Sequence, residues 1–194
     1  MLFSFNQFMH SQKIEVGPEI GFGKSGINDF ETIIISPVSP FNKDYINSLK
    51  FGFMGYLYPK KELLSVNSGL IYNQRGNSDY KFCFLRAPLG LDFNFGKKFK
   101  IFFGGGIYLQ LLTGYQCIDE SDVKSFQLGR LFNIGIGYQF FNNIAFIVKY
   151  DNNYDLTMIY KEMEHSPAVN YVWYEAQKGY DANICFGLRY RIKR

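Results

Sequence analysis

Apolar and polar residues alternate with a period of two along most of this chain, and no other feature constrains its fold more. The alternation covers eight segments: residues 14–22, 51–57, 64–73, 85–95, 100–111, 133–140, 144–151 and 182–192. Side chains of a β-strand point to opposite faces in turn, whereas a helix repeats every 3.6 residues. The pattern therefore predicts an all-β chain with about eight strands.

Two long uncharged stretches, Ile101–Ile118 and Leu131–Val148, raise the alternative of transmembrane helices because each reaches the length that a bilayer requires. The first contains three consecutive glycines at 104–106, and the second contains glycines at 135 and 137. A glycine inside a helix costs about 1 kcal/mol relative to alanine. Aromatic residues make up 19% of the chain and there are 19 glycines, which favours strands and tight turns. Both stretches are therefore predicted to be strands.

The two faces of the predicted strands separate a membrane barrel from a soluble one. One face is rich in Leu, Ile and Phe, as contact with lipid requires, and the other mixes small and charged residues. The lumen of a narrow barrel is just wide enough for side chains to fill. We therefore expect an interior polar network with a structural role, formed by Glu15, Glu19, Arg86, Asp92, Lys149, Asp151, Arg189 and Arg191. A soluble lipocalin-like barrel is the alternative fold, and it would enclose the Leu/Phe face instead.

Closure of such a barrel sets the last strand beside the first, so Arg189 or Arg191 is predicted to pair with Glu15. Arg130 breaks the pattern, because it shares parity with the apolar Ile134 and would face lipid. Two explanations stay open. Either a bulge shifts the register there, or Arg130 lies at headgroup level, where a charge costs only about 0–1 kcal/mol.

Short and long connections alternate between the predicted strands. Turns are expected at 59–62, 96–98 and 141–143, and long loops at about 24–49, 73–80, 116–125 and 152–177. Short periplasmic turns and long external loops are the layout of bacterial outer-membrane barrels. Aromatic residues near the expected strand ends are typical of interfacial girdles: Tyr58, Tyr72, Tyr80, Phe99, Tyr115, Tyr150, Tyr180 and Tyr190. The sequence thus predicts an eight-stranded antiparallel transmembrane up-and-down β-barrel over residues 12–194, in the bacterial outer membrane.

Residues 1–11 precede the first strand and are apolar and aromatic. We interpret them as the remnant of a signal peptide cleaved before Gln12, with an ordinary chain end as the alternative. The three cysteines, Cys83, Cys117 and Cys185, form no C-x-x-C pair, so a zinc site is not expected. A bridge between Cys83 and Cys117 near the loop end stays open.

No motif predicts a cofactor, a metal site or a catalytic centre. Gly21–Gly26 fits G-x-G-x-x-G, yet a phosphate motif needs a following helix, and the β-prone run Thr32–Pro37 follows instead. We interpret this motif as a strand end entering a loop. His165 and Ser166 in the last long loop are interpreted as solvated loop residues, and His10 lies in the suspected leader. The formal net charge of +4 is too small to indicate nucleic-acid binding.

Six segments, taken in order, carry a resemblance to a known family: residues 50–55 (KFGFMG), 68–76 (SGLIYNQRG), 84–89 (FLRAPL), 103–108 (FGGGIY), 132–138 (FNIGIGY) and 186–190 (FGLRY). The chain resembles the small outer-membrane β-barrel family labelled porin-family or PorT-like, over nearly its whole length from Gln12. The resemblance implies a barrel, an outer-membrane location and Sec export, and it brings no catalytic residues. Gly69 departs from the family, in which an acidic residue is common at that place.

The favoured function is that of a non-enzymatic outer-membrane protein whose side-chain-filled barrel holds four external loops for surface contact, adhesion or envelope integrity. One alternative is a narrow porin or small-solute channel, suggested by the charged interior and the family label. The other is a lipid-modifying outer-membrane enzyme, motivated by His165, Ser166 and nearby acids. The expected partners are outer-membrane lipid, including lipopolysaccharide, and the periplasmic chaperones and barrel-assembly machinery during insertion. The barrel is expected to be a monomer that binds no nucleic acid.

Overall fold

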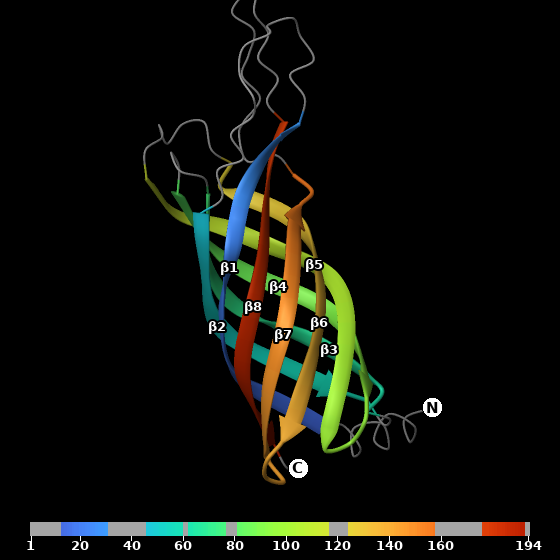
Figure 1. Cartoon of the computed structure of the whole chain (residues 1–194). Helices are drawn as coiled ribbons and strands as arrows, with labels where there is room; N and C mark the ends of the chain where they lie inside the picture. The colour runs from blue at the N-terminus through green and yellow to red at the C-terminus, as the bar shows by residue number, and fades with distance from the viewer. Residues whose placement is uncertain are drawn as a thin grey trace, which may run out of the picture.

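The computed structural model describes residues 13–30, 46–59, 62–76, 81–116, 124–157 and 176–192. They form eight antiparallel strands that pair in chain order and close into a barrel, as Figure 1 shows, so the predicted fold class is confirmed. The strands are β1 (Lys13–Phe30), β2 (Ile46–Tyr58), β3 (Leu64–Gly76), β4 (Lys81–Phe95), β5 (Phe99–Gln116), β6 (Phe126–Gln139), β7 (Ile144–Asp155) and β8 (Ala176–Ile192). Within the described ranges, no helix is long and apolar enough to cross a bilayer.

The barrel closes where β1 pairs with β8, from Ile14 opposite Ile192 to Phe30 opposite Ala176. Followed once around the barrel, the register that starts at Glu15 returns to β1 at Ser25, ten residues further on. With strands about 4.8 Å apart and a rise of about 3.3 Å per residue, this stagger tilts the strands by about 40°. A tilted eight-stranded barrel of this kind has an interior that side chains alone can fill.

The strands expose their apolar face and enclose their charged face. On β4, Leu89 and Phe93 are 54% and 45% exposed, whereas Arg86 and Asp92 are each 1% exposed. The same alternation of exposed and buried positions runs along the whole of this strand. A water-soluble barrel would show the opposite arrangement, so the lipocalin-like alternative is wrong. The predicted inverted polarity, with apolar side chains outside and ionic ones inside, is confirmed.

The barrel has a turn end, with the short connections, and a loop end, with the connections predicted to be long. At the loop end the strands are longer than the sequence pattern predicts. The long connections run over 31–45, 77–80, 117–125 and 156–175, in place of the expected 24–49, 73–80, 116–125 and 152–177. Gly21–Gly26 accordingly lies within β1, which continues to Phe30. At these strand ends the inward residues are polar, such as Asn73 and Asp155, so the composition resembles that of a loop although the alternation continues. One of the four expected long loops, 77–80, is as short as a turn.

Glycines on the inward face of β5 lie where the wall of the barrel leaves no room for a side chain. A Cβ atom added at Gly104 would lie 2.3 Å from the carbonyl oxygen of Leu91 and 2.1 Å from Asp92 Oδ1. A Cβ atom added at Gly106 would lie 2.2 Å from the carbonyl oxygen of Leu89. Both distances are far shorter than van der Waals contact, so β4 and β5 approach as they do because these positions are glycine.

Two predictions about single residues at the barrel wall are corrected. Tyr58 belongs to no interfacial girdle, because it shares the inward face of β2 with Tyr56 and is only 1% exposed. Arg130 is exposed on the outward face, and the pairing of β5 with β6 is unbroken around it, so the bulge explanation is wrong. Its guanidinium carbon lies 5.3 Å from the centre of the Tyr154 ring. A bulge is found elsewhere, between β4 and β5 beside Cys83.

Candidate functional site

The lumen of the barrel holds the charged side chains that the sequence singles out. Of the eight expected residues, seven are buried with exposures of 1–6%, and the Arg191 side chain is 19% exposed near the turn end. Among the described residues, the buried charges comprise six bases and six acids. They are Lys50, Arg75, Arg86, Lys100, Lys149 and Arg189, with Glu15, Glu19, Asp92, Asp151, Asp155 and Asp181. The enclosed part of the lumen is therefore electrically balanced.

Near the turn end, contacts join β1 to β8 across the closing seam. Arg191 donates to Glu15 Oε1 from Nη2 at 2.8 Å and from Nε at 3.1 Å, so the predicted pairing with Glu15 is confirmed. The Tyr58 hydroxyl donates to Glu15 Oε2 at 2.9 Å. Arg189 donates from Nη1 to the Tyr58 hydroxyl at 3.1 Å, and its guanidinium carbon lies 3.6 Å from the centre of the Tyr56 ring. The last strand is thus tied to the first two by ionic and aromatic contacts.

In the middle of the lumen, two bases and two acids are linked into one group. Lys149 Nζ lies 2.7 Å from Glu19 Oε2, and the Tyr56 hydroxyl donates to Glu19 Oε1 at 2.5 Å. Lys50 forms an ion pair with Asp151, and Lys149 lies 3.7 Å from the other oxygen of that carboxylate. The Lys50–Asp151 pair joins β2 to β7 and the Lys149–Glu19 pair joins β7 to β1, and because neither pair of strands is adjacent in the barrel, both contacts cross the lumen.

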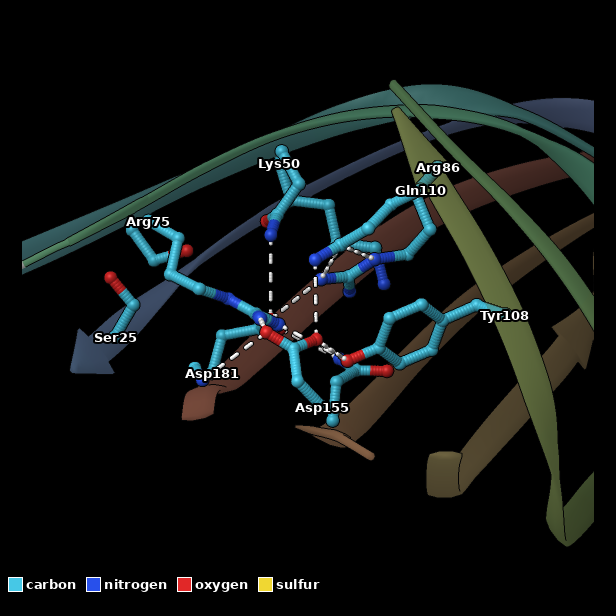
Figure 2. Close-up of polar contacts among 12 residues, drawn as sticks. Ser25, Lys50, Arg75, Arg86, Tyr108, Gln110, Asp155 and Asp181 are labelled. Atoms are coloured by element: carbon cyan, nitrogen blue, oxygen red, sulfur yellow. Dashed lines mark hydrogen bonds and ion pairs between the residues drawn. The ribbon is translucent and has the colours of Figure 1, made fainter. Parts of the chain in front are cut away.

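At the loop end, Arg75 occupies the centre of a second group, shown in Figure 2. Its guanidinium forms ion pairs with Asp155 on β7 and Asp181 on β8, and all three side chains are fully buried. Arg86 donates to Asp181 Oδ2 at 2.9 Å, and its guanidinium carbon lies 4.1 Å from the centre of the Tyr108 ring. Two arginines from β3 and β4 thereby reach the carboxylates of β7 and β8 on the facing wall.

Two buried ions have no opposite charge within 4.0 Å among the described residues: Asp92 and Arg189. Asp92 Oδ1 accepts a hydrogen bond from the Asn133 amide at 3.1 Å. Arg189 relies on the Tyr58 hydroxyl and on aromatic rings. A buried charge is costly unless polar groups replace its water, so both positions depend on these uncharged neighbours.

Five charged residues of the network were absent from the expected set: Lys50, Arg75, Lys100, Asp155 and Asp181. Arg75 and Asp155 fell in segments interpreted as loops. Each nevertheless keeps the inward parity of its strand, Arg75 with Asn73 and Asp155 with Asn153. Extending the period of two by one residue pair beyond Asn73 and by two pairs beyond Asp151 would have found both.

The His, Cys, Asp and Glu side chains of the described residues were the candidates for a metal site. No group of three or more His, Cys, Asp or Glu side chains within it is placed to hold a metal ion. The Cys185 thiol is buried and donates to Asp151 at 3.4 Å, and Cys83 is a free thiol on the outward side of β4. His10, Cys117, His165, Ser166 and the suspected leader at 1–11 lie outside the described residues. The charged side chains of the lumen cross-link strands on opposite walls of the closed barrel.

Comparison with known proteins gives structural neighbours only. No protein-family model matches the chain, and no curated protein matches its sequence. Among solved structures, it is similar to Neisserial surface protein A, with a TM-score of 0.58 at 10% identity over 92% of this chain and 97% of that one. It is also similar to the outer membrane protein OprG from Pseudomonas aeruginosa, with a TM-score of 0.51 at 9% identity over 95% of this chain and 98% of that one.

The fold and the inverted polarity together define the class of protein. The strands form a closed eight-stranded barrel with an apolar exterior, and its neighbours of the same fold are small outer-membrane barrels. A closed barrel with an exposed apolar band requires lipid, because in water that apolar surface would stay in contact with solvent. The chain is a small β-barrel of the bacterial outer membrane.

Proposed function

We propose that this protein is a non-enzymatic outer-membrane barrel whose filled lumen makes it a rigid holder for external loops that act in surface contact or envelope integrity. The observation that carries the proposal is the Arg75 group, which links β3 to both β7 and β8 across the lumen at its loop end. Loops on a rigid scaffold are where such folds usually place their function. Three connections at the loop end, 31–45, 117–125 and 156–175, are long enough for that role.

Burial of the network supports a filled lumen. Arg75, Asp155 and Asp181 have side chains with no exposed surface, and Arg86 and Gln110 are each 1% exposed. Toward the turn end, a cavity walled by Glu15, Arg189 and their neighbours has a volume of about 10 Å³. A space of that size holds about one water molecule. A solute would have to break several ion pairs to pass such an interior.

The partners that this proposal implies are lipids and assembly factors. The outward face would contact outer-membrane lipid, including lipopolysaccharide in the outer leaflet, and the polypeptide would depend on periplasmic chaperones and the barrel-assembly machinery to insert. The barrel would be a monomer without a role in nucleic-acid binding. On the strength of its sequence segments, we group it with the porin-family or PorT-like barrels.

The role of the loops is tested in cells that carry an epitope tag in residues 31–45 or 156–175. We expect the tag to be accessible to antibody on intact cells, and the protein to fractionate with the outer membrane and to require detergent for extraction. A deletion strain complemented with a variant shortened in both loops separates the loops from the barrel. If the shortened protein restores surface contact and envelope integrity fully, the loops are not the functional part.

A narrow channel is the second candidate, and one observation favours it. Buried polar atoms in the lumen lack hydrogen-bond partners among the described residues, including Arg75 Nε, Arg86 Nη1 and Asn73 Oδ1. Such atoms are sites for ordered water, and a chain of waters is the start of a pore. Planar-bilayer recordings decide between the candidates. We expect no openings above background for the wild-type protein, and regular openings would favour the channel.

A lipid-modifying enzyme remains the third interpretation, and its candidate residues His165 and Ser166 lie outside the described part of the chain. The lipid A of a deletion strain checks it. We expect the same lipid A species with and without the gene, and the loss of one modified species would make the protein an enzyme.

A further inference from the structure

The turn end of the barrel opens into a basin whose walls carry an excess of positive charge. The basin has a volume of about 720 Å³, and its charged wall residues are Lys13, Lys97, Lys98, Arg191 and Glu62. Four bases thus face one acid. By the usual orientation of these barrels, the short turns and this basin face the periplasm.

A second, smaller cavity adjoins the basin on its lumen side. The two share Lys98, Gln139 and Arg191 as walls, and the inner one has a volume of about 10 Å³. That is the space of about one water molecule or one ligand oxygen. Arg189 forms part of the wall of this inner cavity.

Arg189 presents unused hydrogen-bond donors at this point. It is only 4% exposed, and its Nε and Nη2 have no hydrogen-bond partner among the described residues. Its third nitrogen donates to Tyr58, and its guanidinium carbon lies 3.6 Å and 4.9 Å from the ring centres of Tyr56 and Phe102. The two rings hold the guanidinium in place. Buried donors without an acceptor are costly, which indicates that something accepts from them.

The nearby acids already form ion pairs with other bases. Glu62 forms ion pairs with Lys13 and with Lys100, the latter at 3.0 Å. Glu15 is bound by Arg191 at 2.8 Å. Within the described ranges, Lys97, Lys98 and Arg189 have no acid within 4.0 Å. Lys97 lines the basin, Arg189 lines the inner cavity and Lys98 lines both, so three bases without an ion-pair partner in those ranges lie along these two spaces.

We propose that this basin binds a phosphate-type oxyanion. Two adjacent N–H groups of an arginine, here Nε and Nη2 of Arg189, point in nearly the same direction and form a fork that donates to such an ion. One oxygen of the ion enters the inner cavity, where it accepts from Arg189, and the remaining charge of the ion meets Lys97 and Lys98. A dianionic phosphate suits three unpaired bases better than a monocarboxylate does.

The rim of the basin allows the phosphate to carry an apolar group. Phe140 and Phe141 line the basin and are 57% and 71% exposed. A phosphate could therefore come from solution or from a lipid headgroup of the periplasmic leaflet, and both offer the same oxygens to Arg189. The site is independent of what the external loops do.

Binding is tested by phosphorus NMR on the refolded full-length protein in a phosphate-free detergent, with inorganic phosphate as the first probe. We expect Arg189→Lys, which keeps the charge but loses the fork, to weaken binding about tenfold, the factor that one charge-assisted hydrogen bond supplies. Removing both exposed lysines, Lys97→Gln and Lys98→Gln, should weaken it several-fold. The matched control, Lys24→Gln with Lys81→Gln, removes two exposed charges at the loop end and should change nothing.

The second probe is phosphatidic acid in the same micelles, with phosphatidylcholine as the reference lipid. If the basin variants weaken the binding of inorganic phosphate, the ligand is a soluble phosphate. If they weaken only the binding of phosphatidic acid, the ligand is a lipid headgroup. The proposal is overturned if neither probe binds, or if the loop-end control weakens binding as much as the basin variants. Because Lys97 and Lys98 lie on an exposed turn, that variant tests the site even if Arg189→Lys does not fold.

Discussion

Replacing Asp181 by Asn tests whether the lumen is dry and packed. The Asp181 carboxylate accepts from Arg75 and Arg86 on one oxygen, and from the amides of Asn153 at 2.7 Å and Asn183 at 2.8 Å on the other. The amide of Asn at 181 has almost the same shape, so packing is preserved. The change removes one negative charge from a lumen whose buried charges are balanced.

The expected loss of stability follows from the bonds that are weakened. Two arginines lose their shared carboxylate, and a charge-assisted hydrogen bond contributes about 1.5–3 kcal/mol. Arg75 keeps Asp155, and Arg86 keeps Gln110 as an acceptor at 2.9 Å, which limits the loss. We expect Asp181→Asn to lower the free energy of unfolding by about 3–5 kcal/mol, the range for breaking a buried ion pair.

Equilibrium unfolding in urea from lipid vesicles measures this loss, and a double-mutant cycle identifies its origin. Arg86→Gln alone should also destabilise the barrel. The double variant should lose at least about 1 kcal/mol less unfolding free energy than the two single variants lose together, because Arg86→Gln removes the charge that Asp181→Asn leaves uncompensated. A loss of under about 1 kcal/mol for Asp181→Asn would mean that water screens the pair as at a surface. The proposal that the lumen is filled, and that the barrel is a rigid holder for the external loops, would then be refuted.

Three further changes test the wall, the exterior and the seam. Gly104→Ala should destabilise the barrel by about 2 kcal/mol or more in the same urea titration, because the new methyl group meets the Leu91 carbonyl. The control Gly55→Ala should be nearly neutral, because its Cβ would have no neighbour closer than 3.7 Å. Leu89→Arg, near the middle of the outward face of β4, should cost about 2–4 kcal/mol of stability in a bilayer. Leu156→Arg, just beyond the end of β7, should cost only about 0–1 kcal/mol. Equal costs would contradict a lipid band centred on the middle of the strands. Tyr58→Phe should cost about 1–2 kcal/mol because Glu15 and Arg189 lose the hydroxyl, and Tyr190→Phe on the exposed face should cost under about 0.5 kcal/mol.

Strand faces could be predicted from the sequence because a barrel in lipid has only two environments. Every second residue meets hydrocarbon and the rest meet the lumen, so the parity of Arg86 and Asp92 was enough to place both inside. The Glu15–Arg191 pair was also predictable, since closure of an up-and-down barrel always joins the first strand to the last.

The contacts across the lumen could not be predicted in the same way. Arg75 meets Asp155 and Asp181 because the register advances ten residues around the barrel. The alternation of apolar and polar residues is the same for any stagger, so it does not predict this one. The loop-end strand extensions were missed for a different reason. Their inward residues are polar because they bond one another, and polar composition is also what a loop shows. Tyr58 was misplaced because tyrosine suits either a girdle or a polar lumen.

Tryptophan scanning against brominated lipids tests the inverted polarity of the barrel most directly. With Trp173, the single tryptophan of the chain, replaced by Phe, new tryptophans are placed one at a time at Leu89, Leu109 and Ile134. All three positions are 46–54% exposed on the outward face. We expect bromine on the acyl chains to quench their fluorescence strongly, and aqueous acrylamide to quench it weakly. Strong quenching by acrylamide without quenching by brominated lipid would show that water covers this face, and the protein would not be a membrane barrel.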